Sequence, residues 1–274
     1  TNVCWRMGSS VIARHIGKQL STTLTASIMG GLPGRSMGSC LHRIHAASEG
    51  ALAQHADLGI VSQDLSKAFD SVALPHALAC ARIYGIARIF LLLLWRFYED
   101  LRRIFALQGC CSRTWKQSKA RLIQGCPMSP ILLNLVMAGW TFHALEPHVK
   151  AVIYLDDRTF WTDNRHDPDD NDGLAAAARL SATVRCSNAF DAAFGLTTNM
   201  TKCQTAANRP GMRTSLDIAN LGYGETQEHL ELLGLKFSFD PDTSTKFKRT
   251  GVDRVTNRLH RIAVAVLKQR YRIE

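Results

Sequence analysis

The chain has 274 residues, 46% of them hydrophobic, which is enough to bury a core and excludes a chain that is disordered throughout. A formal charge of +10 predicts a polyanionic partner such as nucleic acid. Eight cysteines without a CxxC pair, and the lack of an N-terminal signal peptide, favour an intracellular protein over a disulfide-bonded secreted one. The longest apolar run, residues 89–95, falls short of the roughly 20 residues of a membrane span, so we expect no membrane partner.

The charge is unevenly distributed along the chain. Residues 246–274 hold nine Lys or Arg against two acids, and residues 102–121 hold six basic residues and no acid. Between these basic stretches, residues 156–172 hold seven Asp against two Arg. Like charges at this density are expected either to face solvent or to share metal ions. A second cluster, Cys40, His42 and His45, lacks the paired spacing of a structural zinc site.

The first half of the chain predicts a helical part followed by a strand. Apolar residues at four-residue spacing indicate one helix before the GGLPG break at residues 30–34, and a second helix follows it. The apolar run 58–63 predicts a buried strand that ends at Asp64, and Pro75 marks the start of the next helix. Residues 89–95 are predicted to form a buried helix.

The second half predicts a hairpin among helices. A turn at residues 125–127 leads into a long apolar helix, and β-forming residues on both sides of Asp156 and Asp157 predict a β-hairpin with the acids in its turn. Residues 164–172 have the composition of a surface insertion, for which we have no functional account. A helix should end at Gly195, a strand or hairpin should cover 230–239, and residues 252–266 predict an amphipathic helix.

The aspartates at strand ends point to metal-assisted chemistry. Joining a nucleotide to a primer 3′-hydroxyl requires that hydroxyl to lose its proton while charge on the triphosphate is neutralised, which two Mg²⁺ ions can do together. Mg²⁺ prefers carboxylate oxygens and keeps several waters, so a few Asp on rigid strands suffice. Asp64 and the pair Asp156 and Asp157 meet this requirement if the sheet brings them together.

Five segments in order resemble the motifs of reverse transcriptases, especially those of non-LTR retrotransposons. Residues 64–70 (DLSKAFD) resemble motif A, residues 124–130 (QGCPMSP) motif B, and residues 154–157 (YLDD) the YxDD box of motif C. Residues 195–196 with Lys202 resemble motif D, and residues 232–234 (LLG) resemble motif E, the primer grip. The resemblance runs from about residue 5 to residue 240, and motifs A, B and C are its specific parts.

This resemblance implies roles for the acidic residues and for one lysine. Asp64 and Asp156 would be the principal ligands of two Mg²⁺ ions, for which Mn²⁺ could substitute, with Asp157 as an auxiliary ligand. Lys202 would protonate the departing pyrophosphate, although an ordinary surface lysine is an equal alternative. The second acid of motif A, Asp70, is expected to start a helix without contacting metal.

The resemblance also implies residues that bind substrate. Phe69 would be the aromatic gate beneath the sugar, with core packing as its alternative role. Gln124 and Gly125 would lie against the incoming nucleotide and the template, where a glycine allows close approach. Arg35, in an FRPGRS-like box, would contact phosphate, but Gly31 and Leu32 replace the usual Phe and Arg of that box.

The implied fold is α+β, with polymerase palm and fingers, an antiparallel sheet carrying the aspartates, packed helices and a thumb that is largely absent. We expect helical fingers at residues 1–58, the palm with an interleaved fingers segment at 59–240, and a basic helix that begins a thumb or connector at 241–274. The implied partners are an RNA template, a DNA primer and deoxynucleoside triphosphates, in an intracellular, nuclear retroelement protein. Arg254, Arg258 and Arg261 of the basic helix either bind duplex or are simply solvated.

Two other functions stay open from the sequence. A catalytically inactive RNA-binding relic is favoured by the altered fingers box and opposed by the intact acids. An RNA-copying RNA polymerase usually has GDD and a polar residue near the sugar, so Tyr154 and Phe69 argue against it.

Overall fold

A computed structural model of the chain describes residues 3–99, 101–103, 106–107, 110–111, 116–117, 121–167, 169–170, 172–233 and 235–238. Its helices are α1 (Val3–Thr23), α2 (Met37–Ala53), α3 (Ala68–Ser71), α4 (Leu74–Ile83), α5 (Arg88–Glu99), α6 (Met128–Ala144), the short 3-10 helix η1 (Asn164–His166), α7 (Leu174–Phe194) and α8 (Pro210–Ala219). Its strands are β1 (Leu58–Asp64), β2 (Arg102–Arg103), β3 (Ala106–Leu107), β4 (Cys110–Cys111), β5 (Lys116–Gln117), β6 (Lys150–Tyr154), β7 (Asp157–Asp163), β8 (Gln204–Ala207), β9 (His229–Leu232) and β10 (Leu235–Ser238).

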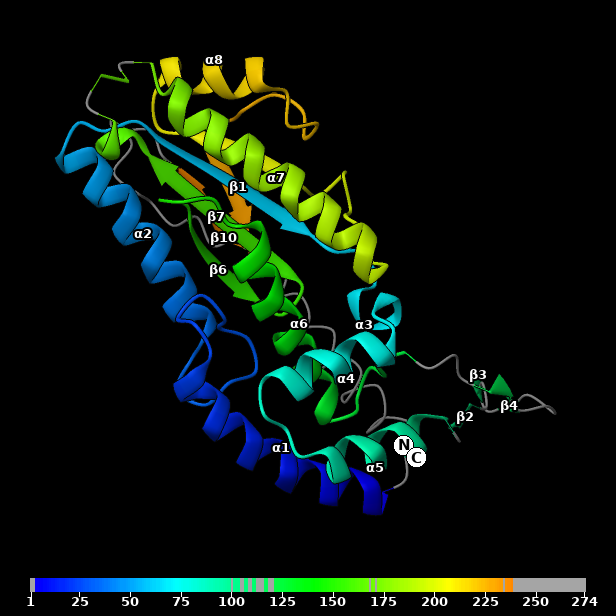
Figure 1. The fold of residues 1–274 in the computed structure, drawn as a ribbon. Coiled ribbons are helices and arrows are strands. Elements are labelled where there is room, and N and C mark those ends of the chain that lie inside the picture. The colour runs from blue at the N-terminus through cyan, green and yellow to red at the C-terminus, as the bar shows by residue number, and fades with distance from the viewer. Residues whose placement is uncertain are drawn as a thin grey trace, which may run out of the picture.

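A four-stranded antiparallel sheet in the order β6-β7-β1-β8 forms the centre of the fold (Figure 1). The long pairing of β1 with β7 runs from Leu58 opposite Asp163 to Asp64 opposite Asp157. Mixed helix and antiparallel sheet is the α+β fold that the sequence predicts. The register matters for function because it fixes which residues meet at each end of the sheet.

Both faces of the sheet are covered, and neighbouring residues of each strand serve opposite faces. Val61 and Phe160 belong to the core cluster that contains α6 and α7, whereas Ile60 and Trp161 belong to the cluster that contains α2 and the β9-β10 hairpin. This alternation is the period-2 pattern of a pleated strand. A strand buried on both sides reads as a continuous apolar run, which is why residues 58–63 predict one.

Several helix boundaries follow from proline and glycine, as the sequence predicts. Pro75 lies in the first turn of α4, where its missing N–H costs no hydrogen bond. Gly195 ends α7 with φ at 69°, a left-handed conformation that glycine adopts without a steric penalty. Helix α6 is buried on nearly all sides, in keeping with its apolar composition.

Helix α5 corrects the prediction of a buried helix at residues 89–95. Leu91, Leu94 and Tyr98 face the core, but Ile89 and Leu93 are 69% and 58% exposed. An apolar run of helix length can bury only the face that meets a neighbour, and α5 packs against α4 on one side. The predicted helix at 252–266 lies outside the described residues. Across the described part of the chain, no helix is both long and apolar enough to span a membrane.

The segment before the second helix is attached to the hairpin that carries the acids. Ile153 donates its backbone N–H to Ser27 at 2.8 Å and accepts one from Met29 at 2.7 Å, which forms a short parallel bridge beside β6. Gly30 follows this bridge, and Asn134 of α6 donates to its carbonyl at 2.6 Å. A Cβ atom on Gly30 would lie 2.6 Å from the backbone nitrogen of Leu155. The turn of the hairpin therefore packs directly on a residue that has no side chain.

We predict that Gly30→Ala destabilises the fold by about 1–3 kcal/mol, because the added methyl group must displace backbone rather than a flexible side chain. Urea unfolding followed by circular dichroism measures the change. Gly8→Ala in α1 is the matched control, since nothing lies within 4 Å of its added Cβ atom. That control should leave stability unchanged or raise it by up to about 1 kcal/mol. Equal stabilities of the two variants would contradict the close packing of Gly30.

Candidate active site

Asp64 and Asp157 meet at one end of the sheet. Asp64 is the last residue of β1 and Asp157 the first of β7, and the two are direct cross-strand partners. Asp156 precedes Asp157 in the two-residue turn between β6 and β7, where Leu155 has φ at 61°. A left-handed residue allows so tight a turn between twisted antiparallel strands. The sequence predicts both acids in the turn; the structure has Asp156 there and Asp157 at the start of the strand.

The carboxylates of this site repel one another in a partly buried environment. The pKa of Asp157 is raised to about 6, first by burial and then by the negative charges of Asp156 and Asp64, with a hydrogen bond to Asp64 in addition. The pKa of Asp156 is raised as well, mainly by burial. Beyond burial, the charge of Asp64 also raises both pKa values, so negative charge at this site is incompletely compensated by the protein. A bound cation would relieve this repulsion.

Two residues after α7 contact Asp64. Asn199 donates its side-chain amide to Asp64 Oδ2 at 3.1 Å, and its backbone N–H reaches the Asp64 carbonyl at 2.8 Å. Lys202 Nζ lies 3.4 Å from the same Oδ2 atom, on a side chain that is 64% exposed. The structure thus brings Lys202 to the acids, as the motif D resemblance implies, while the lysine remains accessible to solvent.

A buried network of hydrogen bonds holds the residues next to Asp64 at the end of β1 and next to Asp157 at the start of β7. Arg158, the neighbour of Asp157, is fully buried and donates to both carboxylate oxygens of Asp191 on α7, at 2.8 and 2.6 Å. Gln63, the neighbour of Asp64, donates to the Tyr223 hydroxyl at 2.6 Å and accepts from Ser187 at 2.9 Å. Each of the two strand-end aspartates is therefore adjacent to a residue fixed to α7 or its surroundings. The sequence does not predict this network.

The described part of the chain contains no group of three or more His, Cys, Asp or Glu side chains placed to hold a metal ion. Asp64 and Asp157 are cross-strand partners, and Asp156 directly precedes Asp157. The donor set is nevertheless suited to a hard cation, because it consists of carboxylate oxygens. A cation that binds here would be held by Asp64, Asp156 and Asp157 with water completing its shell.

Comparison with protein families settles the class of this chain. Residues 3–237 match the family model described as reverse transcriptase (RNA-dependent DNA polymerase). The chain belongs to the reverse transcriptase family. The match spans all five expected motifs, A to E. This reverse transcriptase domain therefore has the fold of a nucleotidyl-transferring polymerase.

Solved structures with a similar fold include telomerases. Apo telomerase from Candida tropicalis, truncated from its C-terminal domain, has a TM-score of 0.60 at 13% identity, with 89% of this chain and 45% of that chain covered. Telomerase from Candida albicans in complex with a TWJ fragment of telomeric RNA has a TM-score of 0.59 at 13% identity, with 88% and 38% covered. At this identity the likeness concerns the fold alone. The reverse transcriptase domain spans less than half the length of these chains.

Of the residues expected to bind substrate, Phe69 lies in a helix shortly after Asp64, and Gln124 and Gly125 lie in a turn. Phe69 is half-buried in α3 and packs partly against the main core. Asp70, in the same helix, is exposed. Gln124 and Gly125 are exposed in the turn before α6, and Gly125 has φ at 84°. Nothing lies within 4 Å of a Cβ built on Gly125, so open space adjoins this turn.

The guanidinium group of Arg35 binds backbone carbonyls of the protein, whereas the resemblance implies a contact with phosphate. Its two Nη atoms donate to four backbone carbonyls at 2.5–2.9 Å, those of Ser21, Leu24, Thr25 and Ile28. Carbonyls after the end of a helix lack partners within the helix, and a guanidinium group satisfies several at once. Arg35 therefore anchors the end of α1 and the following loop, and its terminal nitrogens are occupied.

We predict that breaking the Arg158–Asp191 pair is costly. Arg158→Met or Asp191→Leu alone should lower the free energy of unfolding by about 3–5 kcal/mol, because each leaves a buried charge without its partner. The double variant should cost less than the sum of the two, as urea unfolding in a double-mutant cycle would measure. Arg185→Met on the exposed side of α7 is the control and should stay within about 0.5 kcal/mol. Additive single effects would argue against a coupled pair.

Proposed function

We propose that this domain carries out RNA-directed DNA synthesis by transferring a deoxynucleotide to a primer 3′-hydroxyl. The observation that carries the proposal is the pairing of Asp64 with Asp157 at the end of the β1-β7 ladder, with Asp156 beside them in the turn. The family match supports a polymerase of this type. The template would be RNA, the primer DNA and the substrates deoxynucleoside triphosphates. Origin from a non-LTR retroelement and location in the nucleus are part of the same proposal.

The acids would hold two Mg²⁺ ions, or Mn²⁺, which when bound supply charge neutralisation at the triphosphate and a lower pKa of the primer hydroxyl. Asp64 and Asp156 are proposed as the principal ligands and Asp157 as the auxiliary one. Burial is the largest cause of the raised pKa of Asp157, and the charges of Asp156 and Asp64 add to it. A bound cation would offset those charges, which supports this fit. The buried network would keep both strand ends at a fixed separation.

Lys202 is proposed to donate a proton to the departing pyrophosphate. Its ammonium group lies beside the Asp64 carboxylate and is exposed, so it can reach a group that is bound to the same acids. Gln124 and Gly125 are proposed to lie against the nucleotide and template. Phe69 would lie under the sugar. For Arg35, the four carbonyl contacts favour an indirect contribution through the position of α1 and its loop.

A catalytically inactive RNA-binding relic is the second candidate. It is favoured by two observations, the occupied guanidinium group of Arg35 and the lack of a three-ligand group among the described residues. Primer extension on an RNA template with Mg²⁺, with deoxynucleotides and ribonucleotides compared, separates the candidates. DNA extension supports the polymerase, RNA extension supports an RNA-copying RNA polymerase, and binding without extension supports the relic.

We predict that Asp156→Asn abolishes extension while the domain remains folded, since an amide lacks the negative charge that holds a cation. The unfolding free energy near pH 7 should not fall, because the substitution removes a charge that repels Asp157. Asp169→Asn, in the exposed loop after β7, is the control and should extend primers normally. A folded Asp156→Asn variant that extends at the wild-type rate would contradict the proposed role.

We predict that Phe69→Val lowers the preference for deoxynucleotides. A rigid ring under the sugar can exclude a 2′-hydroxyl, and steric exclusion of one group contributes on the order of 1–3 kcal/mol, roughly ten- to two-hundredfold. The measurement is the ratio of kcat/KM for a deoxynucleotide to that for the matching ribonucleotide. A tenfold fall supports the gate. If both efficiencies fall together, Phe69 is a packing residue.

A further inference from the structure

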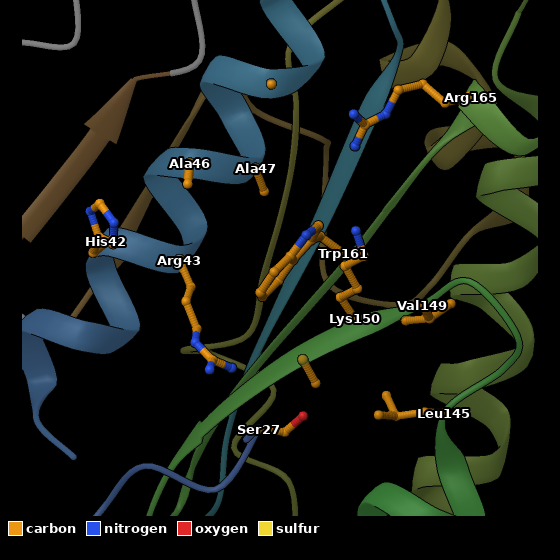
Figure 2. Close-up of a pocket in the computed structure, with 12 residues that line it drawn as sticks. Ser27, His42, Arg43, Ala46, Ala47, Leu145, Val149, Lys150, Trp161 and Arg165 are labelled. Atoms are coloured by element: carbon orange, nitrogen blue, oxygen red, sulfur yellow. The ribbon is translucent and has the colours of Figure 1, made fainter. Parts of the chain in front are cut away.

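A cavity of about 610 Å³ lies between α2 and the β6-β7 hairpin (Figure 2). It is lined from α2, from β6 and the loop before it, and from β7 and η1, and it is large enough for a nucleotide-sized group. It adjoins the Lys150 end of β6, whereas the aspartates lie past the Tyr154 end. Four residue steps along β6 separate these ends, about 13 Å. The cavity is therefore distinct from the acid site and lies at the other end of the β6-β7 hairpin.

The inner surface of the cavity is apolar because α2 presents small residues to it. Ala46 and Ala47 are adjacent on α2, and Gly50 follows about one turn later on the same helix. Trp161 of β7 lines the space from the sheet. Larger side chains at these positions of α2 would fill the gap. An aromatic base is a flat apolar body, and such a surface of small residues beside an indole ring suits it.

The rim of the cavity is cationic. Arg43, Lys150 and Arg165 come from three different elements and are all exposed, and no Asp or Glu lines the cavity. Arg165 forms a salt bridge with Asp163 and a hydrogen bond to Gln54, which orient its guanidinium group and offset part of its charge. Arg43 donates one hydrogen bond, to the Ala26 carbonyl, and within the described residues neither Arg43 nor Lys150 forms a salt bridge. Arg43 and Lys150 therefore provide charge that an anion can use.

The cations are spread along the cavity rather than gathered at one point. Arg165 Nη1 lies 3.8 Å from the position of a Cβ on Gly50, and Arg43 is seven residues earlier on the same helix. Two helical turns correspond to about 10 Å. In Figure 2, Arg43 and Arg165 lie toward opposite ends, with Lys150 and Trp161 between them. This separation exceeds the size of one phosphate group, so the row matches several phosphates in succession.

We propose that this cavity binds single-stranded RNA, with one base against the apolar surface and neighbouring phosphates on Arg43, Lys150 and Arg165. The choice of RNA rests on the proposed function, which makes RNA the template. The site would hold the strand at a second point outside the aspartate centre. Free nucleotides share the same base and phosphate chemistry, but one nucleotide cannot engage cations at both ends of the row.

The test is equilibrium binding of a 20-nucleotide single-stranded RNA to the whole chain by fluorescence anisotropy, in EDTA. Binding in EDTA requires no metal and no catalysis, so its outcome is independent of whether the aspartates support polymerisation. Arg43→Gln combined with Lys150→Gln should reduce the slope of log affinity against log salt by roughly 1.4, from about 0.7 per phosphate contact. The advantage of wild type over this variant should then shrink about sevenfold between roughly 50 and 200 mM salt.

A control with the same loss of charge is Arg82→Gln combined with Arg185→Gln, at exposed positions of α4 and α7 outside the cavity. Its slope should equal that of wild type. Ala46→Phe fills the cavity without changing charge and should weaken binding, whereas Ala53→Phe, an exposed position of α2 outside the lining, should not. Thermal unfolding checks that all variants are folded.

Three results would overturn the proposal. The first is wild-type protein that binds no RNA. The second is a double cavity variant that behaves like the charge-matched control, or an Ala46→Phe variant that behaves like Ala53→Phe. The third is ATP that displaces the RNA from wild-type protein and whose own affinity falls in the cavity variants as much as the affinity for RNA does. A free nucleotide would then be the ligand of the cavity instead of a strand.

Discussion

The geometry of the acid site depends on the buried pair of Arg158 and Asp191. Arg158 follows Asp157 directly on β7, and Asp191 lies on α7, so the pair fixes the hairpin to the helix that covers this face of the sheet. A buried guanidinium group tolerates few alternative positions, because each would leave it without a partner in a medium of low polarity. The indole ring of Trp140, with its centroid 5.0 Å from Arg158 Cζ, limits it further. The position of Asp157 is thus set by charge as well as by the backbone ladder.

The arrangement around Asp64, Asp156 and Asp157 meets two opposing requirements. Carboxylates that are to share a cation must lie close together, and their repulsion has to be offset by the rest of the fold. β1 and β7 supply a ladder of seven residue pairs, and the polar network ties the residues next to Asp64 and Asp157 to α7. Lys202 and Asn199 approach from the loop after α7 and compensate part of the charge on Asp64. The same helix and the loop that follows it therefore support the site from two directions.

Much of the fold could be predicted from the sequence because its signals are local. An apolar run ending at Asp64, β-formers around an acidic pair, and Gly195 after an alanine-rich stretch each predict an element that the structure confirms. The contacts of Arg158 and Arg35 could not be predicted, since a charged residue in a strand or loop is ordinarily assigned to solvent. Their partners lie 33 residues away for Arg158 and up to 14 for Arg35, and no periodicity joins them. The exposed side of α5 could not be predicted either, because it depends on which other helices pack against α5, and composition carries no information on that.

The bridge between Ile28 and Ile153 has a consequence for solubility. Strand β6 is an edge of the central sheet, and an edge presents unpaired N–H and C=O groups to which another chain can add. Residues 27–30 occupy part of that edge, and a second bridge, between Ala206 and Gln227, does the same at β8 on the opposite side. A variant of this domain that lacks the residues up to 30 would expose the free edge of β6, next to the acidic turn of the same hairpin. Its tendency to aggregate would then arise from strand pairing between molecules, even with an intact core.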